Sequence, residues 1–199
     1  MAVTATVAMG LLIFILWINR INQLRVGSGK KCYFVSINGK KHFYYSQMLN
    51  LLGEYEATID SKGRFLVPGS LKKQLPDGES RMIISRGIEK CLTLYPMSSW
   101  EPIVARIRSL NDFEPNVREF KRLFLGGATE VELDSAGRLL LPTQLKEYAG
   151  LGKDITLAAD LDKINIWDSN KYKQFFENFS PEEFSSLAAS VMAEKVDKA

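Results

Sequence analysis

The sequence contains one unit twice, and this duplication limits the possible folds more than any other feature. Residues 53–68 (GEYEATIDSKGRFLVP) are echoed by residues 127–142 (GATEVELDSAGRLLLP) at an offset of 74 positions. The offset then shortens to 72, so that residues 91–95 correspond to residues 163–167. Two copies of about 50 residues result, and both must fold in the same outline.

Each copy predicts two hairpins around a short helix. Apolar and polar residues alternate over residues 55–59 and 129–133, which indicates a half-buried strand. The following Asp-Ser-x-Gly predicts a tight turn in which glycine takes a positive φ, before a return strand. Pro68 and Pro142 then open a short helix. The second hairpins are expected from residues 82–85 with 91–95 and from residues 155–158 with 163–167.

Amphipathic helices are expected after each copy. Ser98 with Glu101, and Ser180 with Glu183, have the spacing of capping boxes, and a further helix is expected from Pro115. Apolar residues that follow at helical intervals are interpreted as core and helix packing. They are Trp100, Ile103, Val104, Ile107, Leu110, Val117, Phe120, Leu123, Phe124, Phe175, Phe176, Phe179, Phe184, Leu187, Val191 and Met192. The predicted fold class is therefore α+β.

The histidine and cysteine content of the chain excludes several classes of function. The only histidine, His42, precedes Met48, so histidine-based catalysis in the duplicated body is excluded. Cys32 and Cys91 stand far apart without a zinc-binding pattern or a disulfide framework. With no nucleophile paired with a base in a recognisable spacing, we expect neither an enzyme nor a cofactor, a metal site or a small-molecule substrate.

The first 47 residues differ from the rest in charge. They hold six basic and no acidic residues, whereas the chain from Met48 onward has a balance of −3. Residues 2–18 are uncharged and just long enough to span a bilayer. We expect residues 1–47 to be translated upstream sequence, with a membrane anchor as the alternative, and a working chain with modules at residues 48–126 and 127–199.

The repeated turn Asp-Ser-x-Gly-Arg has two interpretations. In a purely structural one, Asp caps the turn, Gly takes the left-handed conformation and Arg pairs with Asp. In a functional one, the turn presents arginine outward, where its planar fork matches a guanine edge or a phosphate. The recurrence of arginine directly after the glycine in both copies favours an external role. The turn-forming residues are Asp60, Gly63, Asp134 and Gly137, and the arginines are Arg64 and Arg138.

These motifs resemble the MraZ transcriptional regulators, which are built from two AbrB/SpoVT-type domains. The resemblance is carried by Gly53-Glu54-Tyr55, by Asp60-x-x-x-Arg64 with Pro68, and by Asp134-x-x-x-Arg138 with Pro142. It implies two swapped-hairpin β modules in tandem, each followed by helices. By motif position it also implies DNA contact at Lys62, Arg64 and Arg138. Ala136 has no polar side chain where Lys62 stands, and residues 1–47 have no counterpart in the family.

The same resemblance implies a cytoplasmic, nucleoid-associated repressor of the bacterial division and cell-wall gene cluster, acting on its own promoter. The net negative charge of the chain from Met48 onward disfavours binding to double-stranded DNA, because such binding gains affinity when basic residues neutralise phosphates. A homo-oligomeric ring that repeats the turns would let weak contacts add along repeated promoter boxes. The alternative is an AbrB-type DNA- or protein-binding module without a global repressor role, with membrane tethering as a further variant.

Overall fold

The computed structural model describes residues 30–37, 40–47 and 49–193, which belong to two units that divide after Met48. The first unit contains an antiparallel pair of strands, β1 (Lys30–Ile37) and β2 (Lys40–Gln47). The apolar segment at residues 2–18, on which the membrane-anchor alternative depends, lies outside the described residues. In the part of the chain that is described, no helix is long and apolar enough to cross a membrane.

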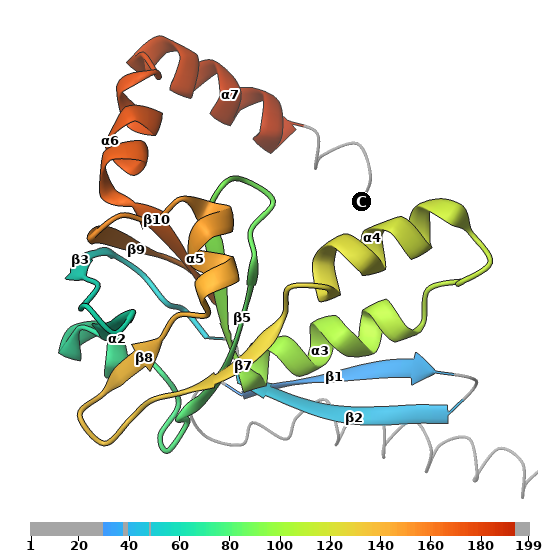
Figure 1. Cartoon of the computed structure of the whole chain (residues 1–199). Coiled ribbons are helices and arrows are strands. Elements are labelled where there is room, and N and C mark those ends of the chain that lie inside the picture. Colours follow the sequence, from blue (N-terminus) through green and yellow to red (C-terminus); the bar gives the residue numbers. More distant parts are fainter. Residues whose placement is uncertain (1–29, 38–39, 48, 194–199) are drawn as a thin grey trace, which may run out of the picture. The chain divides into compact units, whose positions relative to one another are not determined.

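The second unit is built on a six-stranded antiparallel sheet to which both copies contribute three strands (Figure 1). In spatial order the strands are β3 (Glu54–Thr58), β9 (Asp154–Asp160), β10 (Lys163–Asp168), β6 (Leu92–Pro96), β5 (Arg81–Arg86) and β7 (Thr129–Glu132). Counted inward from the two edges, corresponding strands of the two copies occupy equivalent places: β3 and β7 at the edges, β9 and β5 next, and β10 and β6 at the centre. The predicted α+β class is therefore confirmed, with the two copies related by an approximate twofold arrangement.

The first strand of each copy pairs with the other copy. Strand β3 lies beside β9, and β7 lies beside β5. The return strands β4 (Arg64–Leu66) and β8 (Arg138–Leu140) pair with each other in a separate two-stranded ribbon. Only an isolated bridge from Ile59 to Phe65 joins the β3 side of the first turn to β4. The prediction of a hairpin made by β3 and β4 is thus wrong, because both strands have partners in the other copy.

The second hairpin of each copy is confirmed. Strand β5 pairs with β6, and β9 pairs with β10. The short helices α2 (Gly69–Lys72) and α5 (Thr143–Ala149) begin directly after the two expected prolines. Both prolines occupy the N-cap position rather than the first helical residue, so each serves to end the ribbon strand before the helix starts.

The main core lies between the sheet and the β4–β8 ribbon with its two short helices. Phe65 and Leu139 point from the ribbon into this core and are each 1% exposed. Leu94 and Ile164, which face each other across the central strands β6 and β10, are buried in the same cluster. The ribbon is therefore anchored from one side only, which leaves its other side facing outward.

A smaller cluster surrounds Trp100 on helix α3 (Met97–Arg108). Its ring stacks on Phe124 of α4 (Pro115–Leu125), with ring centroids 5.7 Å apart. The capping box expected at Ser98 is wrong, because the N-cap of α3 is Pro96, two residues earlier, and the Ser98 hydroxyl donates to Glu79. Helix α4 begins at proline as predicted.

The last two helices are α6 (Ser169–Glu177) and α7 (Pro181–Ala193). The capping box before α7 is confirmed: the Glu183 backbone N–H donates to the Ser180 hydroxyl, and the Ser180 N–H donates to the Glu183 carboxylate. The prediction that the apolar residues of these helices pack inward is wrong within this chain. Those that remain at least 42% exposed are Phe175, Phe176, Phe179, Phe184, Leu187, Val191 and Met192.

Candidate nucleic-acid interface

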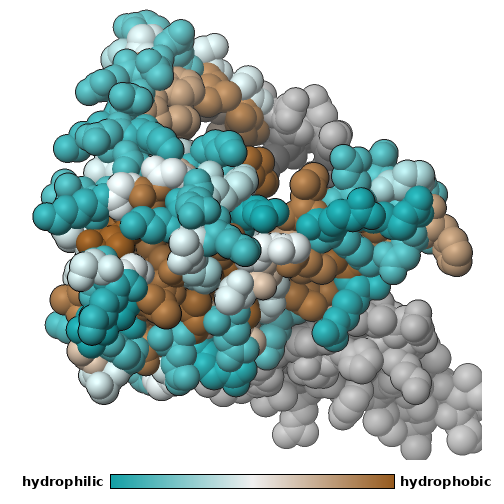
Figure 2. Space-filling view, viewed as in Figure 1, coloured by the Kyte–Doolittle hydropathy of each residue, from teal (hydrophilic) through white to brown (hydrophobic). Residues whose placement is uncertain are grey.

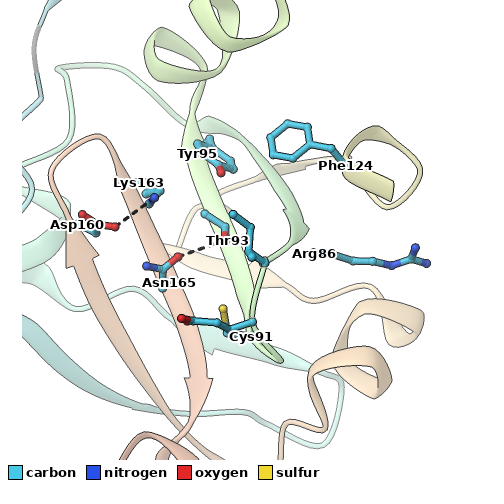
Figure 3. A pocket seen from close by; sticks show the side chains of 11 residues that line it. Arg86, Cys91, Thr93, Tyr95, Phe124, Asp160, Lys163 and Asn165 are labelled. Carbon is cyan, nitrogen blue, oxygen red and sulfur yellow. Dashed lines mark hydrogen bonds and ion pairs between the residues drawn. The ribbon is translucent and has the colours of Figure 1, made fainter. Parts of the chain in front are cut away.

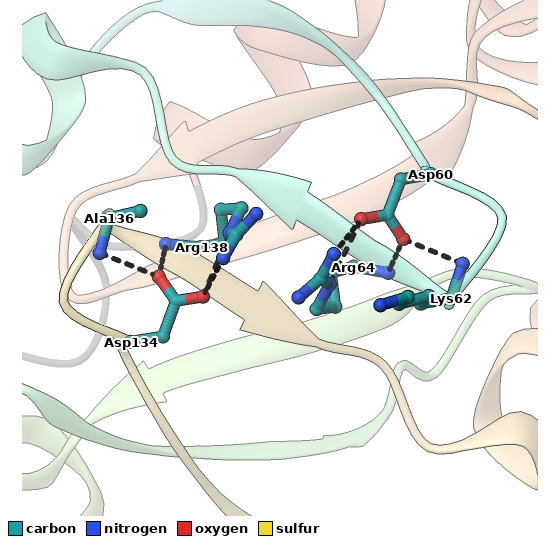
Figure 4. A network of polar contacts seen from close by, with 6 residues as sticks. All are labelled: Asp60, Lys62, Arg64, Asp134, Ala136 and Arg138. Carbon is teal, nitrogen blue, oxygen red and sulfur yellow. Dashed lines mark hydrogen bonds and ion pairs between the residues drawn. The ribbon is translucent and has the colours of Figure 1, made fainter.

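The first repeated turn is held together by one carboxylate (Figure 4). One oxygen of Asp60, Oδ1, accepts hydrogen bonds from the backbone N–H groups of Lys62 and Arg64, both at 2.9 Å. The other oxygen, Oδ2, accepts from Nε and Nη2 of the Arg64 side chain at 2.9 and 2.7 Å. Gly63 takes the expected positive φ of 80°. Asp60 therefore fixes both the path of the turn and the direction of its arginine.

The second turn repeats this geometry residue by residue. Asp134 accepts from the backbone N–H groups of Ala136 and Arg138 at 2.9 Å, and from Arg138 Nε at 2.8 Å. Gly137 has a φ of 78°. The side chains of Arg64 and Arg138 are 27% and 38% exposed, so each guanidinium is held by its aspartate and still reaches solvent.

The ribbon brings the two turns together although they are 74 positions apart in sequence. Arg64 faces Leu140 and Leu66 faces Arg138 in the register of β4 with β8. The carbonyl of Gly63 accepts a hydrogen bond from Leu141, and that of Gly137 accepts one from Val67, each at 3.0 Å. Each turn is thus hydrogen-bonded to the other copy's strand, and the two arginines lie on one ribbon.

The outward face of the ribbon carries a simple pattern. Residues directly opposite each other in an antiparallel pair point to the same face, as do residues two apart along one strand. Arg64, Leu66, Arg138 and Leu140 therefore share the outward face. Both leucines are 56% exposed. We call these four residues the ribbon face.

The carboxylates in the turns remain ionised over the physiological range. The backbone N–H of Arg64, followed by its side chain, lowers the pKa of Asp60 from an ordinary 3.8 to about 2. The pKa of Asp134 is also lowered, chiefly by the backbone N–H of Arg138. The Asp–Arg pair of the structural interpretation is therefore formed in both turns. It uses the Nε–Nη2 side of each guanidinium, and the edge made by Nη1 and Nη2 keeps N–H groups for a partner.

One basic residue beside the second turn was missed by the sequence analysis. The amine of Lys72, on α2 of the first copy, lies 3.5 Å from where a Cβ atom on Gly137 would stand. Lys72 also lines a surface groove together with Asp134 and Ser135. No local signal identifies it, because its position follows from the pairing of β4 with β8.

A second hollow, of about 250 Å³, lies on the other face of the sheet (Figure 3). Thr93 bonds to Asn165 at 3.1 Å and Lys163 pairs with Asp160 at 3.2 Å, whereas the buried Nε of Arg86 has no hydrogen-bond partner among the described residues. Burial raises the pKa of the Cys91 thiol to about 11, which keeps it protonated and unreactive. Within the described residues, no group of His, Cys, Asp and Glu could hold a metal ion.

Together, the fold and site define a duplicated antiparallel β protein that presents twin Asp-x-x-x-Arg turns on a shared ribbon. A family model described as "MraZ protein, putative antitoxin-like" matches twice, at residues 50–123 and 124–194. The chain is 42% identical over 147 residues to the Transcriptional regulator MraZ of Christiangramia forsetii, covering 73% of this chain and 94% of that relative. It is 39% identical over 142 residues to the protein of the same name from Cytophaga hutchinsonii, covering 71% and 93%.

The chain belongs to the MraZ family, which confirms the resemblance carried by the two turn motifs. A third relative, the Transcriptional regulator MraZ of Acetivibrio thermocellus, is 38% identical over 144 residues, which are 72% of this chain and 94% of that protein. Because the relatives are named as regulators of transcription, the prediction that the chain is not an enzyme is also confirmed.

Proposed function

We propose that this chain is a sequence-specific DNA-binding regulator of transcription that contacts double-stranded DNA through the ribbon face. The observation that carries the proposal is the pair of arginines held by aspartates on one two-stranded ribbon. A two-stranded ribbon fits the major groove of B-DNA, where arginine donates two hydrogen bonds to guanine. The names of the relatives support the same class of function.

The aspartates prepare the arginines for this role. Asp60 and Asp134 hold the Nε–Nη2 side of each guanidinium, so the Nη1–Nη2 edge is oriented before DNA arrives. A guanidinium that is already oriented loses less conformational entropy on binding. Lys62 beside the first turn and Lys72 beside the second are assigned to phosphate contacts, which position a protein without reading sequence.

The proposal also covers the regulated genes, the location in the cell and the two modules. We assign the chain the role of a repressor of the division and cell-wall gene cluster, including its own promoter, in the cytoplasm at the nucleoid. The exchange of β3 and β7 between the copies supports the swapped-hairpin description of the two modules, at residues 48–126 and 127–199.

A ring of copies is the expected working form. The body from Met48 carries a net charge of −3, so two arginine turns alone would bind DNA weakly. Hydrophobic side chains gather along α7 and around α4 at the surface (Figure 2). Leu123 and Phe113 near α4 are 61% and 91% exposed, and Phe184 and Met192 on α7 are 66% and 72% exposed. Because α4 and α7 follow different copies, head-to-tail contacts between them can close into a ring.

Residues 1–47 are proposed to lie outside the regulator. The family match begins at residue 50, and the change in charge falls at Met48. The intact mass of the protein from its own cells tests this proposal. A peptide covering residues 31–40, recovered in quantity from those cells, would contradict it.

The function is tested with the full chain and the DNA upstream of its own gene. In a gel shift with excess unrelated competitor DNA, we expect a complex that survives competition. A complex abolished equally by any DNA would contradict sequence-specific regulation and favour the AbrB-type DNA- or protein-binding module without a global repressor role. Light scattering over a wide dilution range tests the ring: a particle of one subunit's mass that still binds the upstream DNA tightly would refute it.

A further inference from the structure

The leucines of the ribbon face are exposed in a way that the fold does not require. Leu66 and Leu140 are each 56% exposed, whereas their strand neighbours Phe65 and Leu139 fill the core. A solvent-facing strand position usually carries a polar or charged side chain, so a matched pair of exposed leucines between two arginines needs an explanation.

Each leucine lies beside the other copy's turn. A Cβ atom on Gly63 would stand 3.9 Å from Leu140 Cδ1, and a Cβ atom on Gly137 would stand 3.9 Å from Leu66 Cδ1. Leu140 is also the direct strand partner of Arg64, as Leu66 is of Arg138. The ribbon face therefore consists of two equivalent units, each with one arginine and one leucine from opposite copies.

The charges around the leucines select the kind of surface that can cover them. Arg64 and Arg138 are paired with their aspartates, and Lys62 in the first turn and Lys72 beside the second add positive charge next to the leucines. A second copy of the same face would bring like charges together, which is unfavourable. DNA instead offers a negative backbone and, in the major groove, one kind of apolar group: the C5-methyl of thymine.

We propose that Leu66 and Leu140 read thymine through its methyl group, so that each unit of the ribbon face recognises a guanine by its arginine and a nearby thymine by its leucine. This inference depends on the proposed function, since it assigns the bases that the same site prefers. The arginine and the leucine of one unit are direct cross-strand partners with Cβ atoms about 4.5–5.5 Å apart, which lies between one and two base-pair steps, so the two side chains can reach bases that are adjacent or two steps apart.

The test uses the full chain and a random duplex pool from which the wild type selects its preferred sites. Thymines in a selected site are then replaced, one at a time, by deoxyuridine, which removes the methyl group and keeps both hydrogen-bonding edges. We expect affinity to fall about fourfold at each contacted thymine, the value for one buried methylene-sized group. Leu66→Ala and Leu140→Ala should each lose the difference between thymine and uracil at their own position.

A matched control is Leu52→Ala. Leu52 is 60% exposed but precedes β3 and lies off the ribbon, so this variant should keep the full thymine preference. The inference is overturned if the wild type binds thymine and uracil sites equally, or if Leu66→Ala and Leu140→Ala retain the preference. A drop in particle mass on light scattering for these two variants would also overturn it, because the face would then contact a second copy. If the wild type selects no sequence at all, the proposed function itself fails together with this inference.

Discussion

Replacing either turn arginine by alanine should weaken DNA binding and leave the fold intact. The backbone of the first turn depends on Asp60 Oδ1, which accepts from the main-chain N–H groups of Lys62 and Arg64. Alanine at position 64 keeps that main-chain N–H. What Arg64→Ala removes is a partly exposed guanidinium and its pairing with Oδ2. Exposed ion pairs contribute little to stability, so the free energy of unfolding should change only slightly.

The expected loss of affinity follows from the guanine contact proposed for each arginine. One bidentate arginine–guanine contact discriminates by about 1–3 kcal/mol, which corresponds to roughly 5- to 150-fold in the dissociation constant. Arg64→Lys separates charge from geometry, because lysine keeps the positive charge and lacks the planar fork. We expect Arg64→Lys to retain binding to unrelated DNA and to lose preference for the selected sequence.

Fluorescence anisotropy on a selected duplex, together with urea unfolding, measures both quantities. Two variants serve as controls. Arg81→Ala removes another exposed arginine, one that pairs with Glu130 at the sheet edge, and should leave DNA affinity unchanged. Phe65→Ala empties a core position next to Arg64 and should cost about 3–5 kcal/mol of stability. If Arg64→Ala or Arg138→Ala destabilises the protein as much as Phe65→Ala does, the arginines are structural and our reasoning is refuted.

Three further outcomes are expected. Because the folded-state pKa of Asp60 is lowered, its contribution to stability is present above about pH 4 and is lost as pH falls toward 2. Asp60→Asn should therefore flatten the decline of the melting temperature between about pH 4 and pH 2. An unchanged decline would contradict the assignment. Lys62→Ala and Lys72→Ala should weaken binding to all sequences alike and each reduce the slope of log affinity against log salt by about 0.9; sequence-dependent losses would argue against phosphate contacts. The Cys91 thiol, with a pKa raised to about 11, should resist iodoacetamide at pH 8 until the protein is unfolded, as mass spectrometry of the peptide would report.

Local patterns predicted the parts of this fold that depend on local chemistry. The two Asp-Ser-x-Gly turns, the β5–β6 and β9–β10 hairpins and the capping box at Ser180 all form within a few residues of chain. The partners of β3 and β4 could not be predicted, because alternation shows that a segment is a strand without showing which strand it pairs with. Ser98 failed as a cap for a related reason, since a distant residue, Glu79, binds its hydroxyl.

The same distinction between local and long-range features applies to the residues of the candidate site. Asp60, Arg64 and their counterparts could be identified from sequence because the turn motif occurs twice with the same spacing. Lys72 and the neighbours of the leucines could not, since their places depend on the pairing of β4 with β8. The outward direction of Leu66 could have been inferred from its position two residues after Arg64 in a strand.

Pairing between the copies also explains how the second turn can lack its own lysine. Ala136 stands where Lys62 stands in the first turn, yet Lys72 from the first copy lies next to Gly137. A cation is therefore present at both turns, supplied locally in one and by the opposite copy in the other. Because each turn has neighbouring groups from the other copy, a substitution in one copy changes the surroundings of the opposite turn.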